Sequence, residues 1–352
     1  MRVLSASEAI APAIHRTKTV LFQPFRIGRS WKLAATAYLS AMGAFFIPTP
    51  FFFLGSGAHR TLPSLLFSFG FGIVFSLISF VFFYLGARLE FVLFDIVLLN
   101  EKFVAPSWKR HSRQSWRWVG FKVLFSIVMG ILSAPAYYFG YMYLMPRLAA
   151  VSAPGQPPSP ELFATLFRFY AVIGLPIGFA FLCSSLLTNF VLPSIALENT
   201  SVREGLRRFF GLMGSEPGSL SLFVVFKVLL AIGGFIAMEA AIVVTELICL
   251  IPLVLIGVAG WFLLRSAGDA GHLLMLAGIV LLATVFAGFL FYLVMLVMGC
   301  VHVFFQAYAL YFLGGRYPLL GDLLESPVSD LADSTFAAAP PPLASPQPDP
   351  LI

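Results

Sequence analysis

The sequence predicts an all-α membrane protein: a polytopic transmembrane helical bundle built from three repeated helical hairpins with interfacial amphipathic helices. Three observations support this prediction. Of the 352 residues, 59% are hydrophobic and only 11% are charged, less than half the charged fraction of about 25% in soluble domains. Several apolar runs reach the roughly 20 residues that a helix needs to cross a bilayer. The same short sequence unit also recurs three times.

The repeated unit is a basic stretch, then an aromatic-lysine pair, then a long apolar run. The pairs are Trp31-Lys32, Phe121-Lys122 and Phe226-Lys227, and the last two lie in identical Phe-Lys-Val-Leu tetrapeptides. Residues 91–100 and 190–199, which close the first two units, are identical at six of ten positions. We therefore predict one multipass domain, residues 1–325, with repeat units at about 5–100, 101–200 and 201–315.

Six segments are apolar and long enough to span a membrane, and a seventh is ambiguous. Residues 248–264 are apolar enough to insert, but units that all start in the cytoplasm need an even number of crossings. If this segment crosses, the C-terminus lies outside the cell; if it does not, six spans leave the C-terminus inside. The matched first two units favour six spans: about 33–54, 64–95, 119–144, 162–194, 219–245 and 272–313.

Lysine and arginine in the connecting segments predict the orientation. Six lie in the N-terminal region up to Lys32, five in residues 99–118 and three in residues 197–218, against Arg60 and Arg147 on the other side. Positive charge stays on the cytoplasmic side of a membrane. We expect the bacterial cytoplasmic (inner) membrane, with the N-terminus in the cytoplasm.

The C-terminal tail has a different composition. Six of the 24 prolines fall between Pro340 and Pro350, among polar residues. Such a segment buries too little apolar surface to fold. Residues 326–352 are therefore predicted to form a disordered cytoplasmic tail.

The basic stretches predict amphipathic helices at the membrane surface, with ordinary positive loops as the alternative. Ser5 with Glu8, and Ser201 with Glu204, have the spacing of a capping box. Apolar residues then recur at helical spacing with basic residues between them. The middle unit has tryptophans suited to the headgroup layer: Trp108, Trp116 and Trp118.

Three lysines are candidate contacts for lipid or for a partner protein. Lys32, Lys122 and Lys227 occupy equivalent points near the predicted cytoplasmic ends of three helices. They can form one site for an anionic lipid or phosphate, or each can extend separately to the interface. Three arginines at the start of the third unit are further candidates: Arg203, Arg207 and Arg208.

Acidic residues near the spans allow ion pairs or transport. Arg88, Glu90 and Asp95 form the densest charge near a span, and we expect pairing within the bundle or with Lys122. Acids inside lipid are costly enough to suggest function, although the ones in the fifth span lie about 30 Å from its start. The candidates for transport are Glu239, Glu246 and His302.

No motif for catalysis, metal binding or a cofactor occurs in the sequence. A P-loop, GxSxG, HExxH or paired-carboxylate cleft is absent, and the connecting segments are short. The basic residues flank apolar runs and do not form a basic face for nucleic acid. We therefore expect no enzymatic activity, no cofactor and no metal. The expected partners are membrane lipids, with another membrane protein as the alternative.

Several stretches resemble the bacterial membrane proteins grouped around the glycerophosphodiester phosphodiesterase membrane domain. The resemblance rests on residues 201–210, on Glu216-Pro217-Gly218 before Phe226-Lys227, and on residues 13–29 and 307–313. It implies a polytopic inner-membrane protein with amphipathic helices before its hairpins. Some members carry a separate phosphodiesterase domain, which has no counterpart here, so the resemblance implies no catalytic residue.

The predicted function is that of a non-enzymatic multipass membrane protein that engages lipid headgroups or a partner protein at its cytoplasmic face. This hypothesis depends on the basic interfacial stretches and on the absence of ionisable groups at mid-membrane depth. The alternatives are a transporter or permease for a small solute or lipid, and an assembly or scaffold subunit of a membrane complex.

Overall fold

The computed structural model describes residues 2–23, 27–44, 62–101, 103–151, 160–264 and 268–325. No strand occurs in these ranges, so the all-α prediction is confirmed. A π-helical turn, Gly140–Leu144, joins the helix that ends at Phe139 to the helix that begins at Met145. The helices are α1 Ile10–Phe22, α2 Ile27–Ala41, α3 Leu62–Leu99, α4 Val104–Arg110, α5 Ser112–Phe139, α6 Met145–Val151, α7 Pro160–Phe190, α8 Leu192–Glu198, α9 Val202–Ser215, α10 Pro217–Leu264, α11 Gly268–Gly314 and α12 Pro318–Glu325.

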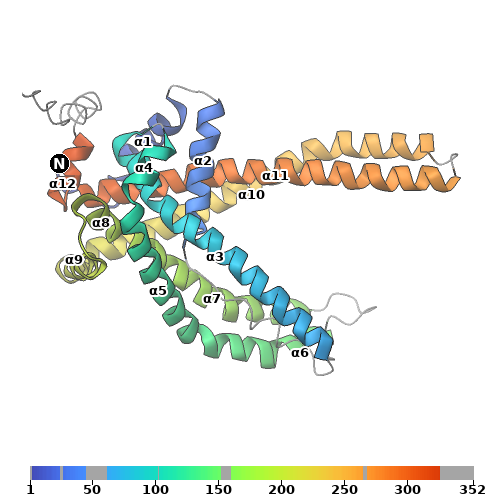
Figure 1. Cartoon of the computed structure of the whole chain (residues 1–352), viewed down its shortest axis with the longest axis horizontal. Coiled ribbons are helices and arrows are strands. Elements are labelled where there is room, and N and C mark those ends of the chain that lie inside the picture. The colour runs from blue at the N-terminus through green and yellow to red at the C-terminus, as the bar shows by residue number, and fades with distance from the viewer. Residues whose placement is uncertain are drawn as a thin grey trace, which may run out of the picture.

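Two arms of long helices diverge from one common end of the molecule (Figure 1). One arm is the antiparallel pair α10 and α11, and the other contains α3, α5 and α7. Around the common end lie the short helices α1, α4, α8, α9 and α12, together with the ends of the long helices that pack on them. We call this end the head. α2 packs on α3 and α11 where the arms separate.

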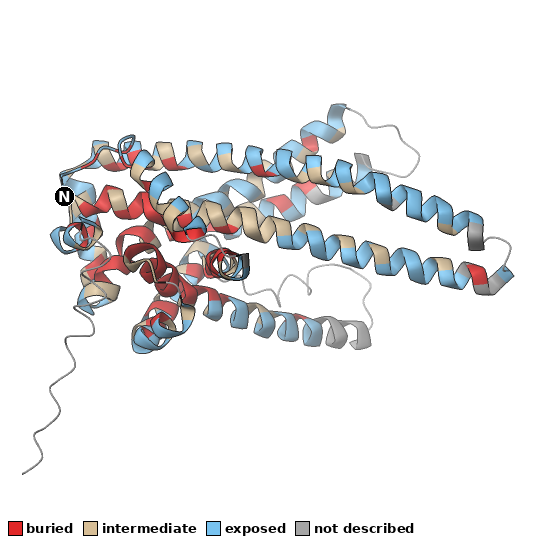
Figure 2. Cartoon of the chain, turned by 90° about the horizontal axis from the view of Figure 1, so that it is seen from above, coloured by how far each residue is buried: buried red, intermediate tan, exposed pale blue. Residues whose placement is uncertain are grey.

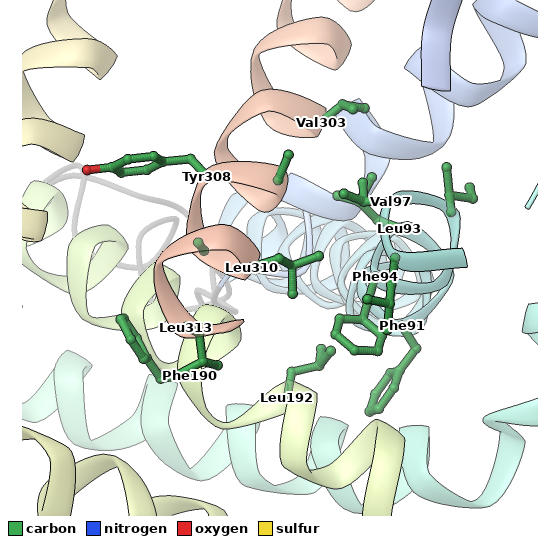
Figure 3. Close-up of a cluster of buried hydrophobic side chains, with 14 of the residues drawn as sticks. Phe91, Leu93, Phe94, Val97, Phe190, Leu192, Val303, Tyr308, Leu310 and Leu313 are labelled. Carbon is green, nitrogen blue, oxygen red and sulfur yellow. The ribbon is translucent and has the colours of Figure 1, made fainter. Parts of the chain in front are cut away.

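Burial is concentrated in the head, whereas the arms are largely exposed (Figure 2). In α3, Phe91 and Phe94 near the C-terminal end are fully buried, but Leu77 and Ile78 in the arm are exposed. Figure 3 shows Phe91 and Phe94 beside Leu192 of α8 and Leu310 of α11 in the apolar core. Long apolar helices with exposed side chains are expected where lipid is the solvent.

Five helical segments are long and apolar enough to cross a membrane. The first predicted span, 33–54, is described only up to residue 44, and the predicted tail, 326–352, lies outside the described residues. Residues 248–264 are the C-terminal part of α10 and no separate segment. The five segments are Phe69–Leu99, Ser112–Leu148, Pro160–Glu198, Pro217–Phe262 and Leu273–Gly314.

The two similar segments that close the first two predicted units share one backbone feature. They end at Asn100 and Asn199, which have φ angles of 53° and 54° and are the described non-glycine residues with positive φ. Asparagine tolerates this left-handed conformation better than most residues and often ends helices with it. The helices of the three predicted hairpins differ widely in length, however, so three equivalent hairpins are not shown and remain a prediction.

Local hydrogen bonds confirm part of the predicted capping. The Ser5 backbone N–H donates to Glu8 Oε2 over 2.9 Å, and the Glu8 N–H donates to Ser5 Oγ over 3.3 Å, in the turn before α1. Ser201 Oγ accepts from the Glu204 N–H and caps α9. Trp118, one of the tryptophans suited to the headgroup layer, has a side chain that is fully buried within the protein.

Glycines allow α2 to approach both arms closely. A Cβ atom on Gly86 of α3 would collide with the backbone of Gly43, just after α2. A Cβ on Gly299 of α11 would likewise collide with the carbonyl group of Ala34. At these two contacts the backbones touch with no side chain between them. Helix α2 therefore lies very close to both α3 and α11.

Candidate functional site

A buried ion pair joins α3 to α5 at the base of the arms. Lys122 is 1% exposed and Glu90 is 7% exposed, and Lys122 Nζ donates to Glu90 Oε1. Trp118 Nε1 donates to Glu90 Oε2 over 2.7 Å, and Lys122 Nζ also donates to the Gly43 carbonyl over 2.6 Å. Both carboxylate oxygens therefore have a donor, which a buried ion pair needs to offset the loss of hydration.

Glu90 also borders a cavity of about 130 Å³, which we call the polar cavity because nine of its fourteen lining residues are polar. The volume is enough for several water-sized groups. Helices α2, α3, α7, α10 and α11 meet around it, so it lies where the two arms join the head. Its lining residues are Ser40, Ala41, Ala44, Glu90, Leu93, Phe181, Ser184, Ser185, Thr188, Asn189, Lys227, His302, Phe305 and Gln306.

Lys227 brings a positive charge to this cavity without a matching acid. Its side chain is buried, and Nζ donates to Ser185 Oγ over 2.7 Å. The rings of Phe223 and Phe305 lie 5.8 Å from Nζ, where the face of a ring attracts a cation weakly. No carboxylate among the described residues forms an ion pair with Lys227. The charge of Glu90, by contrast, is already matched by Lys122.

Two buried amides and a histidine complete the polar lining. Asn189 is 4% exposed and Gln306 is 6% exposed, and their amide nitrogens have no hydrogen-bond partner. An unpaired buried donor costs about 1–3 kcal/mol. His302 Nδ1 donates to the Met298 carbonyl over 2.8 Å, which leaves Nε2 as the acceptor of the neutral ring. Both unpaired amide nitrogens are enclosed by protein atoms at the wall of the cavity.

The predicted lysines occupy different environments. Lys32 is exposed on α2, whereas Lys122 and Lys227 are buried, so the three do not share one surface. The alternative prediction, that each lysine side chain extends separately to the membrane surface, is wrong for Lys122 and Lys227 because both are buried. Glu90, Lys122 and Lys227 are buried ionisable residues within segments that are candidate spans.

The other predicted residues lie mostly outside the cavity. Arg203 and Arg207 are exposed on α9, and Arg208 pairs with Glu198 over 2.8 Å. The transport candidates separate as well: His302 lines the cavity, whereas two acids are exposed on α10 and do not line it. These acids are Glu239 and Glu246.

Sequence reasoning missed Asn189 and Ser185. A signal for Asn189 was present, since it is a lone amide within the apolar run 186–192. Its neighbours in the cavity come from three other long helices and from α2, so the sequence alone does not show that they meet. Across the described residues, no group of three or more His, Cys, Asp or Glu side chains is arranged to hold a metal ion.

A second polar cluster lies nearby at the junction of α3, α4 and α5. Asp95 Oδ2 is 3.0 Å from Arg110 Nη1 and 3.0 Å from His111 Nε2. His111 Nδ1 is 2.5 Å from Gln114 Oε1. Burial of the ring disfavours its charged form, but the hydrogen bonds to Asp95 and Gln114 and the charge of Asp95 outweigh it and raise the pKa of His111.

The fold defines the chain as a helical protein with five candidate membrane spans. A family model matches residues 4–323, so the chain belongs to a family of unknown function, DUF7544. Searches of curated proteins and of solved structures found no match. Nothing in these comparisons links the chain to the glycerophosphodiester phosphodiesterase membrane-domain family.

The buried ion pair predicts a strong asymmetry between single and double substitutions. Lys122→Met leaves the Glu90 carboxylate buried without its counter-charge, which typically costs about 3–5 kcal/mol. Adding Glu90→Gln removes that charge while keeping an acceptor for Trp118, so the double variant should recover much of the loss. Thermal unfolding in a neutral detergent measures both. A Lys122→Met variant as stable as wild type would contradict the pairing.

The raised pKa of His111 predicts that the stability of the fold declines as the pH rises. This pKa is raised in the folded state, so the charged ring stabilises the fold fully below the unfolded pKa of about 6.5. That contribution is lost as pH rises through the higher folded pKa. Between about pH 6 and pH 8, the unfolding temperature of wild type should fall more than that of His111→Gln. Parallel curves for the two proteins would show that His111 does not titrate in this way.

Proposed function

We propose that the protein is a non-enzymatic multipass membrane protein that binds a compact anion in the polar cavity beside Lys227. The observation that carries this proposal is the environment of Lys227. Its buried ammonium group has a neutral hydrogen-bond partner, Ser185, and no acid. The nearby amides of Asn189 and Gln306 have unused donors.

Charge balance favours a ligand with one negative charge. The Glu90 carboxylate is matched by Lys122, so among the described residues that line the cavity Lys227 leaves one excess positive charge. An uncompensated buried charge costs several kcal/mol. A monoanion beside Lys227 removes this cost, and hydrogen bonds between charged groups are stronger than neutral ones.

For the setting, we propose the bacterial cytoplasmic membrane, with the N-terminus in the cytoplasm. The distribution of Lys and Arg between the connecting segments supports this orientation. Lys227 then lies about 15 Å along α10 from Pro217, below the cytoplasmic surface. The matched ends of two units at Asn100 and Asn199 support an internal repeat of hairpins.

Near that surface, the basic helix α9 supports contact with lipid headgroups or with a partner protein. Arg203 and Arg207 are exposed there, and Arg208 is held by Glu198. The expected partners are membrane lipids or another membrane protein, not nucleic acid. In this proposal the arginines hold α9 at the membrane, and the selective anion site is the cavity.

The proposal predicts ligand-dependent stabilisation that requires Lys227. Hexanoate should raise the unfolding temperature of the full-length protein in a neutral detergent, because a ligand at 100 times its Kd stabilises by about 2.7 kcal/mol. Hexanol, which has no charge, should have little effect. Lys227→Met should lose the response to hexanoate, whereas Lys109→Met, at an exposed lysine of α4, should keep it. An equal response in Lys227→Met and wild type would refute the cavity as the anion site.

A transporter is the second candidate, and the position of His302 favours it. Among the described residues, Glu90, Lys227 and His302 line one cavity between helices of both arms. Flux of a carboxylate into proteoliposomes that requires His302 would favour transport. Flux that is lost in Glu239→Gln or Glu246→Gln would place the pathway elsewhere, because both acids are exposed on α10. Binding without flux favours the non-transporting protein.

An assembly or scaffold subunit is the third candidate. It is favoured by the length of the exposed α10 and α11 arm, whose helices have 48 and 47 residues. At 1.5 Å per residue each is about 70 Å long, roughly twice the hydrocarbon thickness of a bilayer. Crosslinking in native membranes from this arm to a stable neighbouring protein would support this role.

A further inference from the structure

An apolar groove of about 350 Å³ adjoins the polar cavity. It lies between α7, α10 and α11, and five residues line both spaces: Phe181, Ser185, Lys227, His302 and Phe305. The two spaces therefore adjoin along these five side chains, with Lys227 among them. The remaining lining residues of the groove are Leu182, Val228, Ala231, Gly234, Phe235, Met298 and Val301.

We infer that the ligand is a single-chain amphiphile, with a compact monoanionic head at Lys227 and an alkyl chain in this groove. The inference rests on the proposed function and adds the chemical class of the ligand. A small soluble anion needs only the polar cavity, whereas an amphiphile uses both spaces at once.

The chemistry of the groove fits an alkyl chain. Apart from Lys227 and His302 at the shared end, and Ser185 beside them, its lining is entirely apolar. Val228 and Phe235 are exposed on the outer side of α10, so the groove opens toward the surface that faces lipid in this proposal. An alkyl chain can enter from that side, and burying it removes apolar surface from polar surroundings.

The polar cavity limits the head to a compact group. Its volume of about 130 Å³ is far below the several hundred Å³ of typical drug-sized pockets. Lys227 provides one charge, and the polar residues Asn189 and Gln306 also line the cavity. A carboxylate is the smallest head that satisfies these groups. A bulky sugar head is too large for this volume. A multiply charged head carries more negative charge than Lys227 balances.

Adjacent glycines of α10 provide a matched pair of test positions. A Cβ on Gly234 would lie 3.9 Å from the Val301 side chain, inside the groove. A Cβ on Gly233 would meet nothing within 4 Å. A leucine at Gly234 therefore fills the groove, whereas a leucine at Gly233 extends away from it. Both substitutions change helix propensity equally, so they differ mainly in filling the groove.

The test compares binding of radiolabelled acetate, hexanoate and decanoate to full-length protein in a neutral detergent. Each buried methylene strengthens binding by up to about fourfold, and detergent competes for the chain, so we expect at least about a tenfold gain from acetate to decanoate. Gly234→Leu should abolish this gain, and Gly233→Leu should keep it. If Gly234→Leu does not fold, Ala231→Leu fills the same groove.

The outcomes separate the two proposals. If binding depends on Lys227 but chain length has no effect, or if filling the groove leaves the gain intact, the anion site stands and the amphiphile is wrong. If Lys227→Met binds all three carboxylates as wild type does, the proposed function itself fails. Loss of the chain-length gain in Gly234→Leu alone, with Lys227-dependent binding throughout, supports both.

Discussion

A carboxylate buried among apolar helices requires a donor for each oxygen, and Glu90 has one from Lys122 and one from Trp118. Lys122 also binds the carbonyl of Gly43, so a single polar cluster ties the end of α2 to α3 and α5. The cost of breaking such a pair is large because the remaining charge stays buried. This cluster forms one wall of the cavity and keeps its shape where the arms diverge.

The same reasoning makes Lys227 a functional residue, whereas Lys122 is a structural one. Both lysines are buried on helices that begin in the head, but only Lys122 faces a carboxylate within the described structure. The charge of Lys122 is balanced by Glu90, whereas we propose that a ligand balances the charge of Lys227. Asn189 and Gln306 line the same cavity as Lys227, and the apolar groove adjoins it.

The sequence predicted what depends on local composition. The all-α class and the positions of the long helices follow from run lengths, and Lys122 and Lys227 followed from the aromatic-lysine repeat. Their burial was not predictable, because Lys32 has the same local pattern and is exposed. The difference arises from partners on other helices, such as Glu90. The role of residues 248–264 was also left open by the sequence. The structure shows that they continue α10 without a break.

An experimental density map of the full-length protein, purified with native lipid in a neutral detergent, tests the central claim most directly. The account predicts a compact feature within hydrogen-bond distance of Lys227 Nζ, continuous with an elongated feature along the groove between α7, α10 and α11. A map in which Lys227 pairs with an acid of the protein itself, and in which side chains fill the cavity, would contradict the account.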